Sequence, residues 1–116
     1  MRICRVDARL AILLVAWPAP VVSFTGAELF DLCFRKGLDG ELACTSYVRG
    51  LADGMAFETL LAIGPARYCP PPTLTVKEMR RIIETYLKGH TDQLNREAGA
   101  LAGVALHQAF PCRGTH

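Results

Sequence analysis

The chain has 116 residues, 51% of them hydrophobic and 21% charged, and its formal net charge at pH 7 is +2. This length accommodates one small domain. Residues 1–23 alone carry a net charge of +2, so the rest of the chain is neutral overall. A neutral domain without a basic stripe argues against nucleic acid or an anionic membrane surface as a partner.

The first 23 residues follow the pattern of a secretory signal peptide. Three arginines precede and flank a short apolar run over 10–17, and small residues follow Pro18 up to Ser23. A membrane anchor is the alternative, but the run is shorter than the roughly 20 apolar residues that span a bilayer. We therefore predict cleavage near Ser23/Phe24, loss of Cys4 with the peptide, and an exported domain over 24–116.

The exported part begins with two predicted helices. Thr25 and Glu28 form a T-x-x-E capping box, which predicts a first helix over 26–34. A turn-rich, glycine-containing loop is expected over 36–41. Apolar residues at three- and four-residue steps then predict a longer helix over 44–63, which a Gly-Pro pair ends.

The second half begins with an irregular segment over 65–74, because consecutive prolines there lack amide donors. A second capping box, Thr75 with Glu78, predicts a helix over 76–88. A connector over 90–95 leads to a fourth helix.

We expect this fourth helix over 96–110, with Asn95 as its candidate cap. Its stretch over 98–106 is apolar or glycine on all sides, which is typical of a helix buried on most sides. No alternating polar and apolar run predicts a strand. The fold class expected is therefore all-α, a small bundle of about four helices.

Four cysteines remain after cleavage, Cys33, Cys44, Cys69 and Cys112. An even set in a short exported chain is typical of disulfides rather than of a metal or redox site. Cys33 ends the first predicted helix and Cys44 begins the second, so of the three possible pairings we predict Cys33–Cys44. Cys69, in the proline segment, is then left to pair with Cys112 after the last helix.

The sequence offers few candidates for chemistry. His90 and His107 could be grouped with Cys112 as metal ligands, but their spacing matches no structural zinc pattern. Asp53 and Glu58 could act as an acid–base pair, but residues five apart share a helical face poorly. We expect no catalytic residue, no cofactor and no metal, and a binding function instead.

Glycines four residues apart occur twice within predicted helices, at Gly50 and Gly54 and at Gly99 and Gly103. Glycine allows another backbone or an aromatic ring to approach closely. We favour tight helix packing within the monomer over a ligand-binding role for these pairs.

Several segments together resemble one known family. They are E-L-F-D-L-C ending at Cys33, C-T-S-Y-V-R-G-L-A-D-G ending at Gly54, Cys69-Pro70, T-V-K-E-M-R-R-I-I-E-T-Y-L from Thr75, and A-L-H-Q-A-F-P-C ending at Cys112. In order and spacing the chain is similar to the Rap/Tai family of small periplasmic immunity proteins. Some members protect bacteria from peptidoglycan amidases delivered by type VI secretion.

This resemblance implies an all-α, disulfide-bonded periplasmic domain that is often a homodimer and that binds and blocks a cell-wall amidase effector. Effector-contacting residues do not follow from it, and we expect them in the loops over 35–43, 64–74 and 90–95, since binding residues concentrate in loops on a rigid frame. The main alternative is a periplasmic structural or chaperone-like module without a dedicated toxin partner. A carrier of small ligands would need an apolar cavity.

Overall fold

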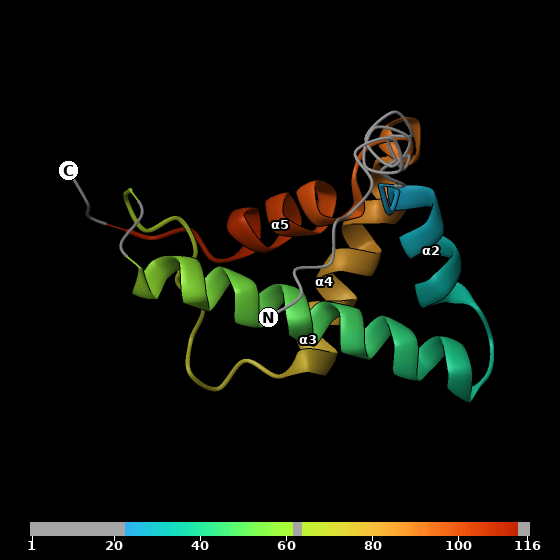
Figure 1. Ribbon diagram of the computed structural model, residues 1–116, viewed down its shortest axis with the longest axis horizontal. Helices are drawn as coiled ribbons and strands as arrows, with labels where there is room; N and C mark the ends of the chain where they lie inside the picture. The colour runs from blue at the N-terminus through green and yellow to red at the C-terminus, as the bar shows by residue number, and fades with distance from the viewer. Residues whose placement is uncertain (1–22, 62–63, 114–116) are drawn as a thin grey trace, which may run out of the picture.

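The computed structural model describes residues 23–61 and 64–113, which form four α-helices (Figure 1). They are α2 (Gly26–Phe34), α3 (Leu38–Leu60), α4 (Val76–Gly89) and α5 (Ala98–Ala109), with a short 3₁₀ helix, η1 (Thr91–Gln93), between the last two. No strand occurs in this part of the chain. The all-α prediction is confirmed. The predicted signal peptide, with Cys4, lies outside the described residues except for Ser23.

Both predicted capping boxes form and set where α2 and α4 begin. The Glu28 carboxylate accepts a hydrogen bond from the Thr25 backbone N–H at 2.7 Å, and the Glu28 N–H donates to the Thr25 hydroxyl at 3.3 Å. Thr75 and Glu78 repeat this arrangement at 2.8 and 3.2 Å. Hydrogen bonds from these threonines hold the pKa of each glutamate below its ordinary value of 4.5. Since α2 and α4 begin where expected, local side-chain chemistry determines both starts.

Helix α3 begins six residues earlier than predicted, so the loop expected over 36–41 is wrong. Gly37, with φ of 111°, breaks the chain after α2, and Asp39 lies in the first turn of α3, where a negative charge is favourable. Gly40 is a packing residue, because a Cβ there would lie 2.8 Å from the Arg35 carbonyl oxygen. The glycines therefore allow a close approach of α2 and α3. At its other end, α3 stops at Leu60, and the predicted end at residue 63 lies outside the described residues.

Both predicted disulfides are present. Cys33 and Cys44, with Cα atoms 4.9 Å apart, join the end of α2 to α3. Cys69 and Cys112, with Cα atoms 5.0 Å apart, join the proline segment to the chain after α5. The pairing follows from which helix ends are neighbours, as the sequence indicates.

Helix α5 begins at Ala98 instead of residue 96, and Asn95 is not its cap. The residues before α5 accept hydrogen bonds from the start of α2 instead. The N–H groups of Gly26 and Ala27 donate to the carbonyl oxygens of Arg96 and Leu94, both at 2.8 Å, and the Ala98 N–H donates to the Phe24 carbonyl oxygen at 2.8 Å. Because the start of α2 would otherwise lack hydrogen-bond acceptors for these donors, the segment before α5 stays irregular.

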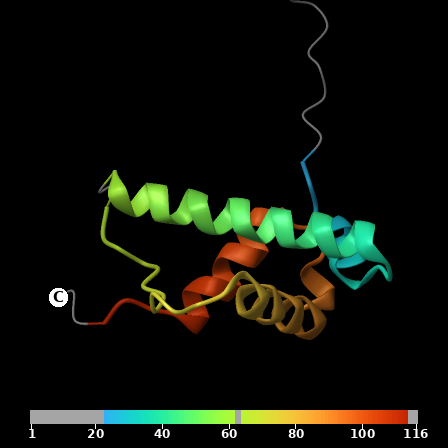
Figure 2. The same cartoon turned by 90° about the horizontal axis from the view of Figure 1, so that it is seen from below.

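The core lies where the four helices face one another. Figure 2 shows α3 as one layer of the molecule, with α4 and α5 on the same side of it. The largest fully buried side chains come from every helix, namely Leu29, Cys44, Val48, Ile83, Leu87, Leu101 and Leu106. As expected, the stretch 98–106 of α5 is buried on most sides, and of its residues only Ala100 is exposed. No helix in the described ranges is long and apolar enough to cross a membrane.

Gly40 and Gly103 give a matched pair of helical substitutions. Gly40→Ala should destabilise the fold, because its Cβ would press against the Arg35 backbone. Gly103→Ala, where no atom lies within 4 Å of the new Cβ, should stabilise it by up to about 1 kcal/mol. Urea unfolding of both variants measures the difference. Equal effects of the same sign would contradict this packing role of Gly40.

The capping glutamates should make stability depend on pH. A lowered carboxylate pKa in the folded state adds stability above pH 4.5, and this contribution disappears as the pH falls through the folded-state value. The Glu28→Gln/Glu78→Gln variant keeps acceptors for the capping boxes but does not titrate. It should be less stable than the wild type at pH 7 and equal to it near pH 2, as measured by thermal unfolding. A constant difference at both pH values would contradict the assignment.

Candidate partner-binding surface

The segment 64–74 is exposed along almost its whole length and yet is anchored at its centre. The Cys69–Cys112 disulfide joins it to the end of α5, and the Cys69 N–H donates to the Phe110 carbonyl oxygen at 2.9 Å. Prolines at 70–72 restrict the backbone further. We call this segment the proline loop. It displays its side chains on a nearly fixed backbone, as a binding loop requires.

Tyr68 is the buried anchor of the proline loop, with 8% of its surface exposed. Its hydroxyl donates to the Met79 sulfur at 3.6 Å, and its ring lies edge-on to Phe110, with centroids 6.4 Å apart. Burial raises the pKa of the Tyr68 hydroxyl. The tyrosine stays neutral at physiological pH. Its buried ring anchors the exposed loop residues on either side of it to the core.

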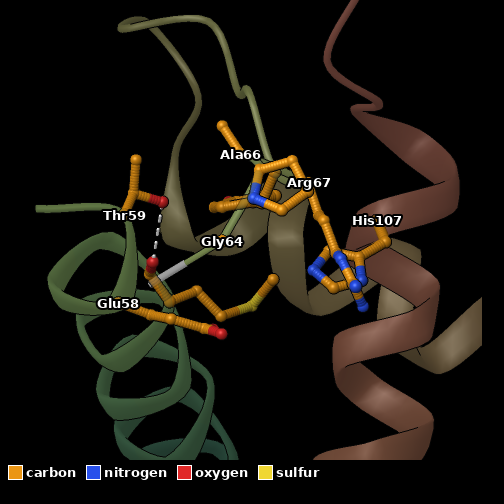
Figure 3. A pocket seen from close by; sticks show the side chains of 9 residues that line it. Glu58, Thr59, Gly64, Ala66, Arg67 and His107 are labelled. Carbon is orange, nitrogen blue, oxygen red and sulfur yellow. Dashed lines mark hydrogen bonds between the residues drawn. The ribbon is translucent and has the colours of Figure 1, made fainter. Parts of the chain in front are cut away.

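A cavity of about 350 Å³ opens between the proline loop, the end of α3 and α5. Glu58 comes from α3, Arg67 from the loop and His107 from α5. In Figure 3 the Arg67 side chain extends toward His107, while Glu58 projects from the facing helix. Three elements thus bring a cationic, a titratable and an anionic group around one cavity. This arrangement suits the recognition of a polar side chain rather than of an apolar ligand.

A second cavity of about 350 Å³ is lined by the second half of the proline loop. Pro71 and Leu74 line it from the loop, Ile82 and Arg81 from α4, and Phe110 from the end of α5. Its lining is more apolar than that of the first cavity. The two halves of the loop therefore border two cavities of different chemistry.

Large apolar side chains are exposed at the end of α3, beside the first cavity. Phe57, Leu60 and Leu61 have 59%, 79% and 51% of their surface exposed. In the same half of the helix Gly54 has no atom within 4 Å of the position of a Cβ, and neither has Gly50. The expected tight packing of these glycines within the monomer is therefore wrong. Gly103 is equally open, and Gly99 meets only the Tyr47 hydroxyl, at 3.6 Å.

The other two expected loops are less suited to present side chains. Most of the segment 35–43 is the start of α3. In 90–95, the His90 ring stacks on Tyr86 at a centroid distance of 3.9 Å, and its Nδ1 lies 2.8 Å from the Tyr86 carbonyl oxygen. These contacts occupy His90 within its own turn. Of the three loops, only the proline loop is held by a disulfide and exposed along almost its whole length.

The residues considered for metal binding or acid–base chemistry do not lie together in one site. His90, His107 and Cys112 do not form a ligand cluster. The one close group among the described residues is Cys33, Cys44 and Glu84, whose two sulfurs are joined in a disulfide. Asp53 is exposed and does not line the cavity that Glu58 lines. His107 is half-buried, as interpreted from the sequence.

The family description of Rap1a immunity proteins matches residues 25–112. The chain belongs to this family. The match includes all four helices, both disulfides and the proline loop, and it confirms the resemblance to Rap/Tai immunity proteins. No curated protein matches the chain.

Family membership indicates immunity against a secreted effector, and with it the binding of a protein partner. Proteins of this kind are generally not enzymes. The two disulfides together with the family indicate a secreted or periplasmic protein.

Removing the Cys69–Cys112 disulfide should free the proline loop. In the Cys69→Ser/Cys112→Ser variant we expect trypsin to cut after Arg67 much faster than in the wild type, because the backbone there is no longer held. The free energy of unfolding should fall by about 2–5 kcal/mol. Limited proteolysis with mass spectrometry measures the rate, and Arg81 within α4 serves as the internal control. Unchanged cleavage after Arg67 would show that the disulfide does not order the loop.

Proposed function

We propose that this protein is a periplasmic immunity protein that binds a cognate peptidoglycan amidase, delivered by type VI secretion, and blocks its active site. The domain responsible would be 24–116, after removal of a signal peptide over 1–23. The proline loop carries the proposal. It is an exposed segment with a buried tyrosine and a disulfide at its centre, and little ordering remains to be done when a partner binds.

The chemistry around the loop supports contact with an enzyme's polar surface. The loop presents Arg67 beside His107, with Glu58 across the cavity. Charged groups placed in this way select a partner by complementary charge and hydrogen bonding. The neighbouring exposed apolar residues, Phe57 and Leu60, add area that becomes favourable when it leaves water.

A steric block is favoured over catalysis. The charged groups around the loop come from three elements, and the Thr59 hydroxyl that lines the same cavity donates to the Met55 carbonyl oxygen at 3.1 Å rather than to a catalytic base. Binding alone explains why the loop is rigid and exposed. We propose that the protein is not an enzyme and that its effect on the amidase is occlusion.

The exposed apolar residues of α3 are also the observation that favours the second candidate, a chaperone-like module. Such a module would bind unrelated unfolded proteins through apolar surface, whereas an immunity protein binds one folded partner. Protection of several unrelated clients from aggregation, without inhibition of an amidase, would favour the chaperone-like function.

We further propose that the protein acts as a homodimer, as the family resemblance implies. A domain of this size buries a limited fraction of its surface, so association adds stability that its own core does not supply.

The immunity function is tested against peptidoglycan amidases delivered by type VI secretion, beginning with any amidase-like product of a neighbouring gene. The oxidised protein should bind one such amidase and stop its hydrolysis of peptidoglycan at equimolar ratio. Arg67→Glu should weaken inhibition at least about tenfold, since reversing a charge at the centre of an interface removes one contact and introduces repulsion. Arg96→Glu, an exposed arginine in the segment before α5, is the matched control and should leave inhibition unchanged. Full inhibition by the Arg67 variant would show that the proline loop is not at the interface. No binding of an amidase by the wild type would contradict the proposal.

A further inference from the structure

The two disulfides of the protein lie in opposite environments. Cys33 and Cys44 are buried in the core, and we call their bond the core disulfide. Cys69 is exposed and Cys112 is half-buried, and we call their bond the loop disulfide. Thiol–disulfide exchange begins when a thiolate reaches one of the two sulfurs, so exposed disulfides are the labile ones. In the folded protein, access therefore favours the loop disulfide.

The course of the backbone turns the Cys69 side chain toward solvent. Tyr68 is buried, whereas its neighbours Arg67 and Cys69 are exposed. Because Cys69 precedes a proline, its backbone favours an extended conformation, and in an extended chain successive side chains point to opposite sides. An inward Tyr68 thus places Cys69 on the outer side, in the middle of an exposed stretch that an attacking thiol can approach.

Charge adds to the difference in access. The Glu84 carboxylate lies within 4.8 Å of both sulfurs of the core disulfide, and a negative charge there repels an attacking thiolate. Its ion pair with Arg80 weakens this repulsion, so burial is the larger barrier. Among the described residues no carboxylate lies this close to both sulfurs of the loop disulfide. Arg67 and Arg113 lie within two residues of it in the sequence, and their positive charge attracts a thiolate.

We infer that the loop disulfide is a thiol–disulfide exchange site for a dithiol reductant, and that its reduction releases the proline loop from a frame that stays folded. A thiolate of the dithiol attacks the Cys69 sulfur and forms a mixed disulfide, and Cys112 leaves as a thiolate that takes up a proton. The second thiolate of the reductant then displaces Cys69, which is protonated in turn. The reductant becomes a disulfide by losing two electrons and two protons, and the protein gains both.

The helical frame does not depend on the loop disulfide. The core disulfide still joins α2 to α3 after the exchange, and the Arg80 guanidinium of α4 still donates to the Cys33 carbonyl oxygen at 2.9 Å. Every buried hydrophobic residue among those described lies in one of the four helices, except Tyr68. Release of the loop therefore removes a single side chain from the core.

Without its disulfide the proline loop is held by non-covalent contacts alone. The Cys69 N–H donates to the Phe110 carbonyl oxygen at 2.9 Å, and the Tyr68 hydroxyl donates to the Met79 sulfur at 3.6 Å. A segment with so few contacts opens locally at small free-energy cost, so its backbone is no longer fixed. The same contacts keep Cys69 near Cys112, so the bond should re-form once the dithiol is removed.

The inference rests on the proposed function only in its consequence. A released loop has to be ordered again when it binds an effector, and this cost weakens binding. The state of the loop disulfide would thus control how well the protein blocks its amidase. The exchange itself is measured on the protein alone, so its failure and the failure of the amidase test are separate results.

The first experiment measures how fast each disulfide opens. The full chain with Cys4→Ser, in which the four paired cysteines are the only ones, is treated with dithiothreitol. Free thiols are blocked with N-ethylmaleimide at intervals, and mass spectrometry quantifies each cysteine peptide. We expect the loop disulfide to open at least about tenfold faster than the core disulfide, because only the loop disulfide is accessible.

Denaturing urea is the control, since it removes the burial of the core disulfide and should largely abolish the preference. Equal rates in the folded protein would overturn the inference. The same preference in urea would also overturn it, because the sequence around the cysteines rather than the fold would then set the rates.

The second experiment follows the loop after selective reduction. Trypsin should cut after Arg67 much faster than in the oxidised protein, with Arg81 in α4 as the internal control, while circular dichroism keeps its helical signal. Reoxidation should restore the slow rate. In the Cys69→Ser/Cys112→Ser variant, the same dithiothreitol treatment should leave the rate unchanged. Unchanged cleavage of the reduced protein, or loss of its helical signal, would overturn the release of the loop from a folded frame.

The third experiment measures inhibition of an amidase that the oxidised protein blocks. The selectively reduced protein should inhibit at least about tenfold less, and reoxidation should restore inhibition. Equal inhibition by the two forms would overturn the control of binding by this bond.

Reduced thioredoxin in place of dithiothreitol distinguishes a protein dithiol from a small one. Opening of the loop disulfide by both reagents supports a site that accepts a protein dithiol. Opening by dithiothreitol alone supports a site for small dithiols. Opening by neither reagent in the folded protein would overturn the inference.

Discussion

The buried disulfide between Cys33 and Cys44 determines where α3 lies, and the other elements are arranged around it. Cys44 is fully buried and Cys33 nearly so, and their bond joins α3 to the end of α2. At the same point the Arg80 guanidinium of α4 donates to the Cys33 carbonyl oxygen at 2.9 Å, and Glu84 holds this arginine at 2.6 Å. Three helices are thus fixed to one another by a covalent bond and a half-buried ion pair.

The second disulfide acts on a different part of the molecule. Cys69 and Cys112 are 43 residues apart in the sequence, whereas Cys33 and Cys44 are separated by 11. A larger closed loop removes more freedom from the unfolded chain, so the second bond is expected to contribute more through entropy. Its local effect is to hold the proline loop, most of whose residues are exposed. One disulfide therefore organises the frame, and the other fixes the surface that the frame presents.

The predictable parts of this structure are those determined locally. The Thr25–Glu28 and Thr75–Glu78 boxes gave the starts of α2 and α4 because capping depends on residues three apart. The start of α3 was missed, since Gly40 looks like a turn residue until its contact with the Arg35 backbone is seen. This error arises where the start of one helix packs against the end of the preceding one, a contact that the sequence pattern does not show.

The start of α5 and the first cavity depend on contacts between segments that are distant in the sequence. Residues before Ala98 stay irregular because their carbonyl oxygens accept from the first N–H groups of α2, which no local pattern signals. Glu58, Arg67 and His107 come from three separate segments. The only sequence signal for their meeting is the Cys69–Cys112 pairing, which brings the end of α5 to the proline loop.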